Sequence, residues 1–195
     1  MSQYYSNYME ECYSVLEKLE VWTENNNSMS GEEGINQWVE ATKKVKETGK
    51  TIYFVGNGAS AMMAGHMSAD ATKNGGLKCL FLSETALLTA VSNDISYHDV
   101  FSFPLRRFAV EGDMLIAISS SGNSENIIRA IGAAKEKQMQ IVTLTGLNEE
   151  NRARKSGDIN LYVPGKTYGI VEVCHQALLH CWLDKYLDVY EGGRI

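Results

Sequence analysis

Short apolar runs alternate with helix-like stretches from residue 51 onward, and this alternation limits the possible folds more than any other feature. The runs are almost continuously apolar, which is typical of strands that are covered on both faces. Strands that alternate with helices along a chain build a parallel sheet between two layers of helices. We therefore expect an α/β fold with three layers and a five-stranded parallel sheet. The strands are predicted over residues 51–55, 78–82, 114–119, 139–145 and 159–163.

Two helices are expected ahead of this α/β unit. The apolar residues of 1–24 have helical spacing, 25–31 is predicted to be a loop, and Ser30-Gly-Glu-Glu33 is a capping-type start for a helix over 32–48. No linker separates these helices from the rest, so we expect one domain over 1–195, with a core over 50–190. The later helices are predicted over residues 60–73, 86–92, 124–137 and 168–190.

Composition and charge exclude several classes of partner. The net charge is -6, so the chain has no overall attraction for nucleic acid or for an anionic membrane. No window has the eighteen or more apolar residues of a membrane span, and the acidic N-terminal stretch lacks a signal-peptide pattern. The four cysteines are scattered and form no C-x-x-C pair, which is typical of reduced thiols in a cytoplasm. We expect a cytoplasmic protein.

Two turns rich in glycine and serine each follow a predicted strand and open a predicted helix. They are Gly56-Asn57-Gly58-Ala59-Ser60 and Ser119-Ser120-Ser121-Gly122-Asn123-Ser124. Ligands of open parallel sheets bind at the carboxyl ends of the strands, and helix N-termini attract anions. Neither turn matches the common nucleotide-binding fingerprints. The pattern predicts a phosphate site, although capping and turn formation alone would explain a single turn of this kind.

Two pairs of potential metal ligands lie at helical spacing. His66 and Asp70 are four residues apart on one predicted helix, and Glu172, Gln176 and His180 share a face of the last helix. Two histidines and two carboxylates are a ligand set that zinc accepts. From spacing alone, a local hydrogen bond and a solvated helix face are simpler interpretations than a metal site.

The chain resembles the sugar isomerase (SIS) family, and within it the phosphoheptose isomerases. GNGAS and SSSGNS carry the resemblance, together with stretches over most of the chain such as AVSND, IVTLTG and EVCHQALLH. The resemblance implies an SIS-domain fold in which both turns hold a sugar phosphate, and Asn93 and Asp94 match a substrate-contacting Asn-Asp pair. The residues implied for phosphate binding are Asn57, Gly58, Ala59, Ser60, Ser119, Ser120, Ser121 and Ser124.

The resemblance also implies roles for the histidines and carboxylates. The family has His-x-x-x-Glu on one helix, and a Gln with a His eight positions later on another. The matching positions here are His66, Asp70, Glu172 and His180. By resemblance these four residues hold zinc, Asp70 and Glu172 also contact the substrate, Asp70 removes a proton next to the carbonyl, and His180 exchanges protons with the oxygens.

Two of these four positions depart from the family pattern. Asp70 replaces a glutamate, so its carboxylate is one methylene shorter and must be brought closer to a substrate carbon. Glu172 replaces a glutamine, and its added negative charge strengthens cation binding but disfavours an anionic enediolate. The loop after the helix of His66 is also short, and the stretch 168–171 lacks the acidic and basic residues that the family usually has there.

The resemblance predicts an aldose–ketose isomerase that interconverts sedoheptulose 7-phosphate and D-glycero-D-manno-heptose 7-phosphate through an enediol. It also predicts a homotetramer with active sites between subunits, which the aromatic residues of the first helix would suit. Two alternatives stay open. One is an isomerase for another ketose phosphate, because of the altered positions. The other is a non-catalytic SIS scaffold that binds a replication initiator protein, which the retained histidines and carboxylates disfavour.

Overall fold

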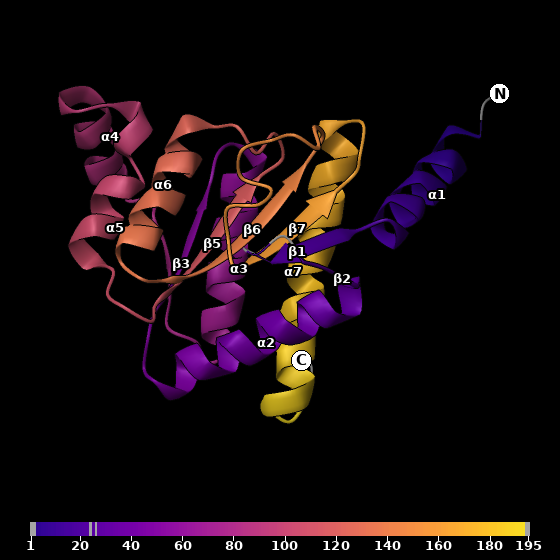
Figure 1. Cartoon of the computed structure of the whole chain (residues 1–195), viewed down its shortest axis with the longest axis horizontal. Coiled ribbons are helices and arrows are strands. Elements are labelled where there is room, and N and C mark those ends of the chain that lie inside the picture. The colour runs from indigo at the N-terminus through magenta and orange to yellow at the C-terminus, as the bar shows by residue number, and fades with distance from the viewer. Residues whose placement is uncertain (1–2, 24, 26, 194–195) are drawn as a thin grey trace.

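A seven-stranded sheet lies between two layers of helices in the computed structural model of the chain, which describes residues 3–23, 25 and 27–193 (Figure 1). Within these residues the strand order is β2-β1-β7-β6-β5-β3-β4, and the last five strands in this order are mutually parallel. The five predicted strands are thereby confirmed, with small shifts at their ends. They are β3 (Ile52–Gly56), β4 (Cys79–Phe81), β5 (Met114–Ser119), β6 (Gln140–Gly146) and β7 (Ile159–Val163).

An antiparallel hairpin adds two strands that the sequence analysis did not predict. Helix α1 (Tyr4–Glu17) ends earlier than expected, and the chain continues as β1 (Glu20–Thr23) and β2 (Ser28–Met29). The prediction of a helix up to 24 and a loop over 25–31 was therefore wrong for these segments, and so was the strand count of five. Residues 1, 2, 24 and 26 of those predictions lie outside the described residues.

Packing explains why the hairpin replaces the helix. Val21 is almost fully buried, and its methyl groups contact Gly34, where a Cβ would lie 2.6 Å from Val21 Cγ1. β1 pairs with β7 along its whole length. A four-residue strand with one buried side chain has too short a pattern to be distinguished from the apolar spacing of the preceding helix.

The helices form two layers, one on each face of the sheet. Buried residues of α1, α2, α3 and α7 share one apolar cluster with one face of the strands, and those of α4, α5 and α6 share a second cluster with the other face. Helix α5 and a short 3₁₀ turn at Tyr97–Asp99 were not predicted. The remaining helices are α2 (Gly31–Glu47), α3 (Ala59–Lys73), α4 (Thr85–Asp94), α5 (Ser102–Phe108), α6 (Glu125–Glu136) and α7 (Tyr168–Tyr190).

A pair of stacked indoles holds α2 against α7. The rings of Trp38 and Trp182 are both fully buried, with centroids 4.7 Å apart and planes 8° apart. Trp182 Nε1 donates to Thr42 Oγ1 at 2.9 Å, so the polar end of this indole is satisfied. None of the described helices is long and apolar enough to span a membrane.

His175 is a fully buried histidine on α7. Its Nε2 lies 3.0 Å from the carbonyl oxygen of Thr145, so this nitrogen carries the proton and donates. Burial lowers the pKa of His175 to about 4, against a smaller opposing effect of that hydrogen bond. In the folded protein the imidazole of His175 is therefore neutral at neutral pH.

This buried imidazole predicts a pH dependence of stability. Between its unfolded and folded pKa the unfolded chain binds more protons at His175, so stability falls as pH falls through this window. Lowering the pH from 6.5 to 5 should reduce the free energy of unfolding by about 2 kcal/mol through His175 alone. Urea unfolding of the wild type and of His175→Gln at both pH values isolates this contribution. Equal losses of stability in the two proteins would contradict it.

Candidate active site

A cavity of about 150 Å³ lies where the two predicted turns meet, at the carboxyl ends of β3 and β5. The two turns are far apart in sequence, but parallel neighbouring strands end at the same edge of a sheet. The first residue of α7 closes the cavity from a third side. The lining residues are Asn57, Ser60, Ile118, Ser119, Ser120, Ser121, Ser124, Tyr168 and Glu172.

Three helix N-termini surround this cavity. Ser60 is the second residue of α3, Ser124 is the N-cap of α6, and Tyr168 is the first residue of α7. The Ser124 hydroxyl does not cap its own helix, and the N-cap of α3 is Gly58, which has no side chain. Such helix starts leave backbone N–H groups and a partial positive charge for a ligand. The described lining residues include no lysine or arginine, so the backbone supplies the attraction for an anion.

The three consecutive serines differ in how their hydroxyls are used. Ser119 Oγ accepts from the backbone N–H of Gly122 at 3.1 Å, and Ser121 Oγ accepts from that of Asn123 at 3.3 Å. Ser120 is only 5% exposed, and its Oγ has no hydrogen-bond partner among the described residues. A buried hydroxyl without a partner is costly. A bound oxyanion would accept from this hydroxyl and remove the cost.

Gly122 allows the serine turn to close tightly. Its φ is +61°, and a Cβ at this position would lie 1.9 Å from Asn151 Oδ1. The Asn151 side chain is itself fixed, since its Nδ2 donates to the carbonyl oxygen of Asn148 at 2.7 Å. The turn therefore needs glycine both for backbone conformation and for space.

Exchanging this glycine tests how strictly the turn is fixed. Gly122→Ala should lower the free energy of unfolding by at least about 2 kcal/mol, because strain in the left-handed region adds to the clash with Asn151. Gly132 on α6 is the matched control, since a Cβ there meets nothing within 4 Å. Gly132→Ala should stabilise the protein by about 0.5–1 kcal/mol. Chemical denaturation measures both, and similar values for the two variants would contradict the described turn.

A second group of candidate residues lies along the contact between α3 and α7. His66, Asp70 and His180 each offer one ligand atom, and these atoms lie within 4.8 Å of one another. His66 Nε2 is 3.4 Å from Asp70 Oδ2, and the rings of His66 and His180 have centroids 5.3 Å apart. Two imidazoles and a carboxylate fit zinc, which in catalytic sites takes three protein ligands and keeps one position for water or substrate.

Glu172 does not belong to this close group. It lines the serine cavity, and it is eight residues before His180 on α7, about 12 Å along the helix axis. Gln176 lies between them, and its Nε2 is 3.3 Å from Met67 Sδ on α3. The expectations that Glu172 ligates a metal and that it contacts a substrate both stay predictions.

Gly58, Ala59, Asn93 and Asp94 were also predicted to contact the substrate, and they do not line the cavity. Gly58 and Ala59 form the start of α3, and Asn93 and Asp94 end α4, where Asn93 Nδ2 donates to Asp94 Oδ1 at 2.8 Å. Tyr168 also lines the cavity, and it was not predicted from the sequence. Its position in the sequence could have indicated this. Tyr168 begins the helix that follows β7, and so it lies at the carboxyl ends of the parallel strands.

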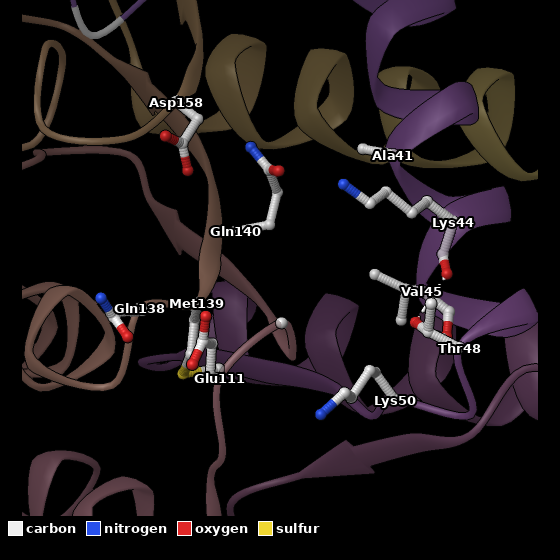
Figure 2. Close-up of a pocket in the computed structure, with 11 residues that line it drawn as sticks. Ala41, Lys44, Val45, Thr48, Lys50, Glu111, Gln138, Met139, Gln140 and Asp158 are labelled. Carbon is white, nitrogen blue, oxygen red and sulfur yellow. Dashed lines mark hydrogen bonds between the residues drawn. The ribbon is translucent and has the colours of Figure 1, made fainter.

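A larger cavity of about 490 Å³ lies at the opposite edge of the sheet, before the N-terminal ends of β5, β6 and β7 (Figure 2). Lys44 and Lys50 line one side of it, and Glu111 and Asp158 the other. It contains none of the residues predicted to bind or react with a substrate. Ligands of parallel sheets bind at the other edge, where the serine cavity lies.

Comparisons with known proteins identify the family of the chain. The family model of the SIS domain matches residues 8–146, and the chain therefore belongs to the SIS domain family. A phosphoheptose isomerase of Shewanella denitrificans is 38% identical over 144 residues, which are 70% of this chain and 74% of the relative. One of Aromatoleum aromaticum is 35% identical over 141 residues, or 68% and 71% of the two chains. The structure of phosphoheptose isomerase GmhA from Neisseria gonorrhoeae superposes with a TM-score of 0.80 at 30% identity, covering 94% of this chain and 95% of the other.

Proposed function

We propose that the chain is a phosphosugar isomerase that interconverts an aldose phosphate and a ketose phosphate. Its substrates in this proposal are sedoheptulose 7-phosphate and D-glycero-D-manno-heptose 7-phosphate, in line with the names of its relatives. The observation that carries the proposal is a single arrangement of two sites along α3 and α7. An anion cavity lies at one end of these helices, and a His/Asp/His group lies further along them.

In this proposal an extended sugar reaches from one site to the other, with its phosphate in the serine cavity and its carbonyl at the His/Asp/His group. Ser60 in the cavity and Asp70 in the second group are ten residues apart on α3, about 15 Å along the helix axis. In this proposal the hydroxyls of Ser119, Ser120, Ser121 and Ser124 hold the phosphate, together with the N-termini of α3 and α6. Glu172 contacts the sugar and not the phosphate, which its carboxylate would repel. It accepts hydrogen bonds from sugar hydroxyls.

Two side chains of the second group carry the proton transfers. The Asp70 carboxylate removes the proton from the carbon next to the carbonyl, which gives an enediol, and returns it to the neighbouring carbon. His180 gives a proton to one oxygen and takes one from the other. Because Asp70 is a methylene shorter than glutamate, the substrate carbon must come closer to α3 than it would for the longer side chain.

Zinc is the cofactor that we propose for this group, with His66, Asp70 and His180 as its ligands. When bound, it would polarise the carbonyl oxygen and stabilise negative charge on it. One carboxylate oxygen of Asp70 suffices as a ligand, so the other stays available for the proton transfer.

Assembly and location complete the proposal. We propose a homotetramer with active sites between subunits, supported by the exposed tyrosines of α1. Tyr4, Tyr5 and Tyr13 are each more than half exposed, and Figure 1 shows α1 reaching away from the sheet. The four cysteines are free thiols, which suits the reducing cytoplasm in which we place the protein.

Replacing Asp70 tests the proton transfer. Asp70→Asn should lower the conversion of sedoheptulose 7-phosphate at least about 100-fold, because the amide cannot accept the proton, while the sugar phosphate still binds. Asp188→Asn, an exposed change near the end of α7, is the control and should keep full activity. NMR time courses measure conversion, and ligand line broadening measures binding. Unchanged turnover in Asp70→Asn would remove Asp70 from the mechanism.

Zinc binding tests the cofactor independently of activity. His180→Ala should weaken zinc affinity by tenfold or more in competition with a chromophoric chelator, because it removes one of three ligands. His98 is exposed and lies outside the group, so His98→Ala should bind zinc like the wild type. Equal affinities in both variants would contradict the assigned ligands.

A further inference from the structure

Asn57 in the first turn is held by two side chains that the sequence analysis did not single out. Asn57 Nδ2 donates to Asn126 Oδ1 and Asn126 Nδ2 donates to Asn57 Oδ1, both at 2.9 Å. The hydroxyl of Tyr97 also donates to Asn57 Oδ1, at 3.0 Å. The three residues come from three separate segments: the loop after β3, the start of α6, and the 3₁₀ turn after α4.

The burial of these side chains indicates a rigid arrangement. Asn126 is only 2% exposed, so its carboxamide has little opportunity to exchange its partner for water. Asn57 is half-buried in the wall of the serine cavity. Two mutual hydrogen bonds between planar amides fix the plane of both groups, and they join the turn after β3 to the start of α6.

The hydrogen-bond inventory decides what Asn57 offers to the cavity. A carboxamide oxygen accepts two hydrogen bonds, and the Asn57 oxygen already accepts from Asn126 and Tyr97. Its Nδ2 carries two hydrogens and uses one of them toward Asn126. The remaining group is an N–H donor, which suits a phosphate oxygen.

We propose that Asn126 and Tyr97 are positioning residues that make Asn57 a donor-only group toward the phosphate of the substrate. The proposal rests on the proposed function, in which the serine cavity holds that phosphate. With its oxygen occupied, Asn57 cannot turn its carbonyl toward an anion. The two partners thus act on substrate affinity through Asn57, without touching the substrate themselves.

Binding of inorganic phosphate tests this role without requiring turnover. Tyr97→Phe removes one hydroxyl from a side chain that is 51% exposed, and it should weaken phosphate binding about fivefold in calorimetry. Asn126→Asp replaces the Nδ2 donor by a second oxygen, so Asn57 Oδ1 loses this hydrogen bond and faces a carboxylate oxygen instead. This variant should bind phosphate at least about tenfold more weakly.

Two matched controls separate positioning from other effects. Tyr190→Phe removes a tyrosine hydroxyl that bonds Glu40 far from the cavity, and it should leave phosphate affinity unchanged. Asn123 lies within the serine turn, and its Oδ1 accepts from the backbone N–H of Arg152 and not from Asn57. Asn123→Asp therefore adds the same charge as Asn126→Asp without changing a partner of Asn57. Its effect gives the purely electrostatic part of the loss, which should be smaller than the loss in Asn126→Asp.

The split between KM and kcat distinguishes a positioning role from a purely structural one. For both positioning variants KM should rise by the same factor as the phosphate dissociation constant, with kcat within about twofold of the wild type. Wild-type phosphate affinity in Tyr97→Phe, or equal losses in Asn126→Asp and Asn123→Asp, would overturn the proposal. A wild type that binds phosphate but does not isomerise the sugar would refute the proposed function alone. A wild type that binds no phosphate would refute both.

Discussion

The common edge of the parallel sheet is the constraint on which the candidate site depends. Because β3, β5 and β7 run in the same direction, the turns and helix starts that follow them meet at one place. Free backbone N–H groups and serine hydroxyls are concentrated there without any lysine or arginine in the described cavity wall. The attraction for an anion is thus a consequence of topology, and the turn sequences need only small residues that leave the backbone accessible.

The same helices that begin at this cavity carry the second group of reactive side chains. Ser60 and Asp70 lie on α3, and Glu172 and His180 lie on α7, so in the proposed reaction the helix rise sets the separation between phosphate and carbonyl. The stacked indoles of Trp38 and Trp182 hold α7 in the core, where small shifts are costly. In the proposed reaction this rigidity matters more than usual, since Asp70 is shorter than the glutamate of the family pattern.

Much of this could be predicted from the sequence, and the exceptions have physical causes. The parallel strands and both turns have strong local patterns, because buried strands are continuously apolar and their turns need glycine and serine. Among the described residues of the hairpin of β1 and β2, Val21 alone is deeply buried, and the hairpin depends on pairing with a distant strand. The bonds among Asn57, Asn126 and Tyr97 join three separate segments, and no local spacing predicts such contacts. Glu172 lies in the cavity and His180 in the histidine group, a division that helix periodicity alone could not reveal.

An NMR time course of sedoheptulose 7-phosphate with zinc-loaded protein in deuterated water tests the proposed reaction most directly. We expect that an aldose 7-phosphate forms and that deuterium enters the carbon next to its carbonyl, because Asp70 would exchange its proton with solvent at the enediol stage. An unchanged and unlabelled sugar that still binds saturably would contradict an isomerase acting on this substrate.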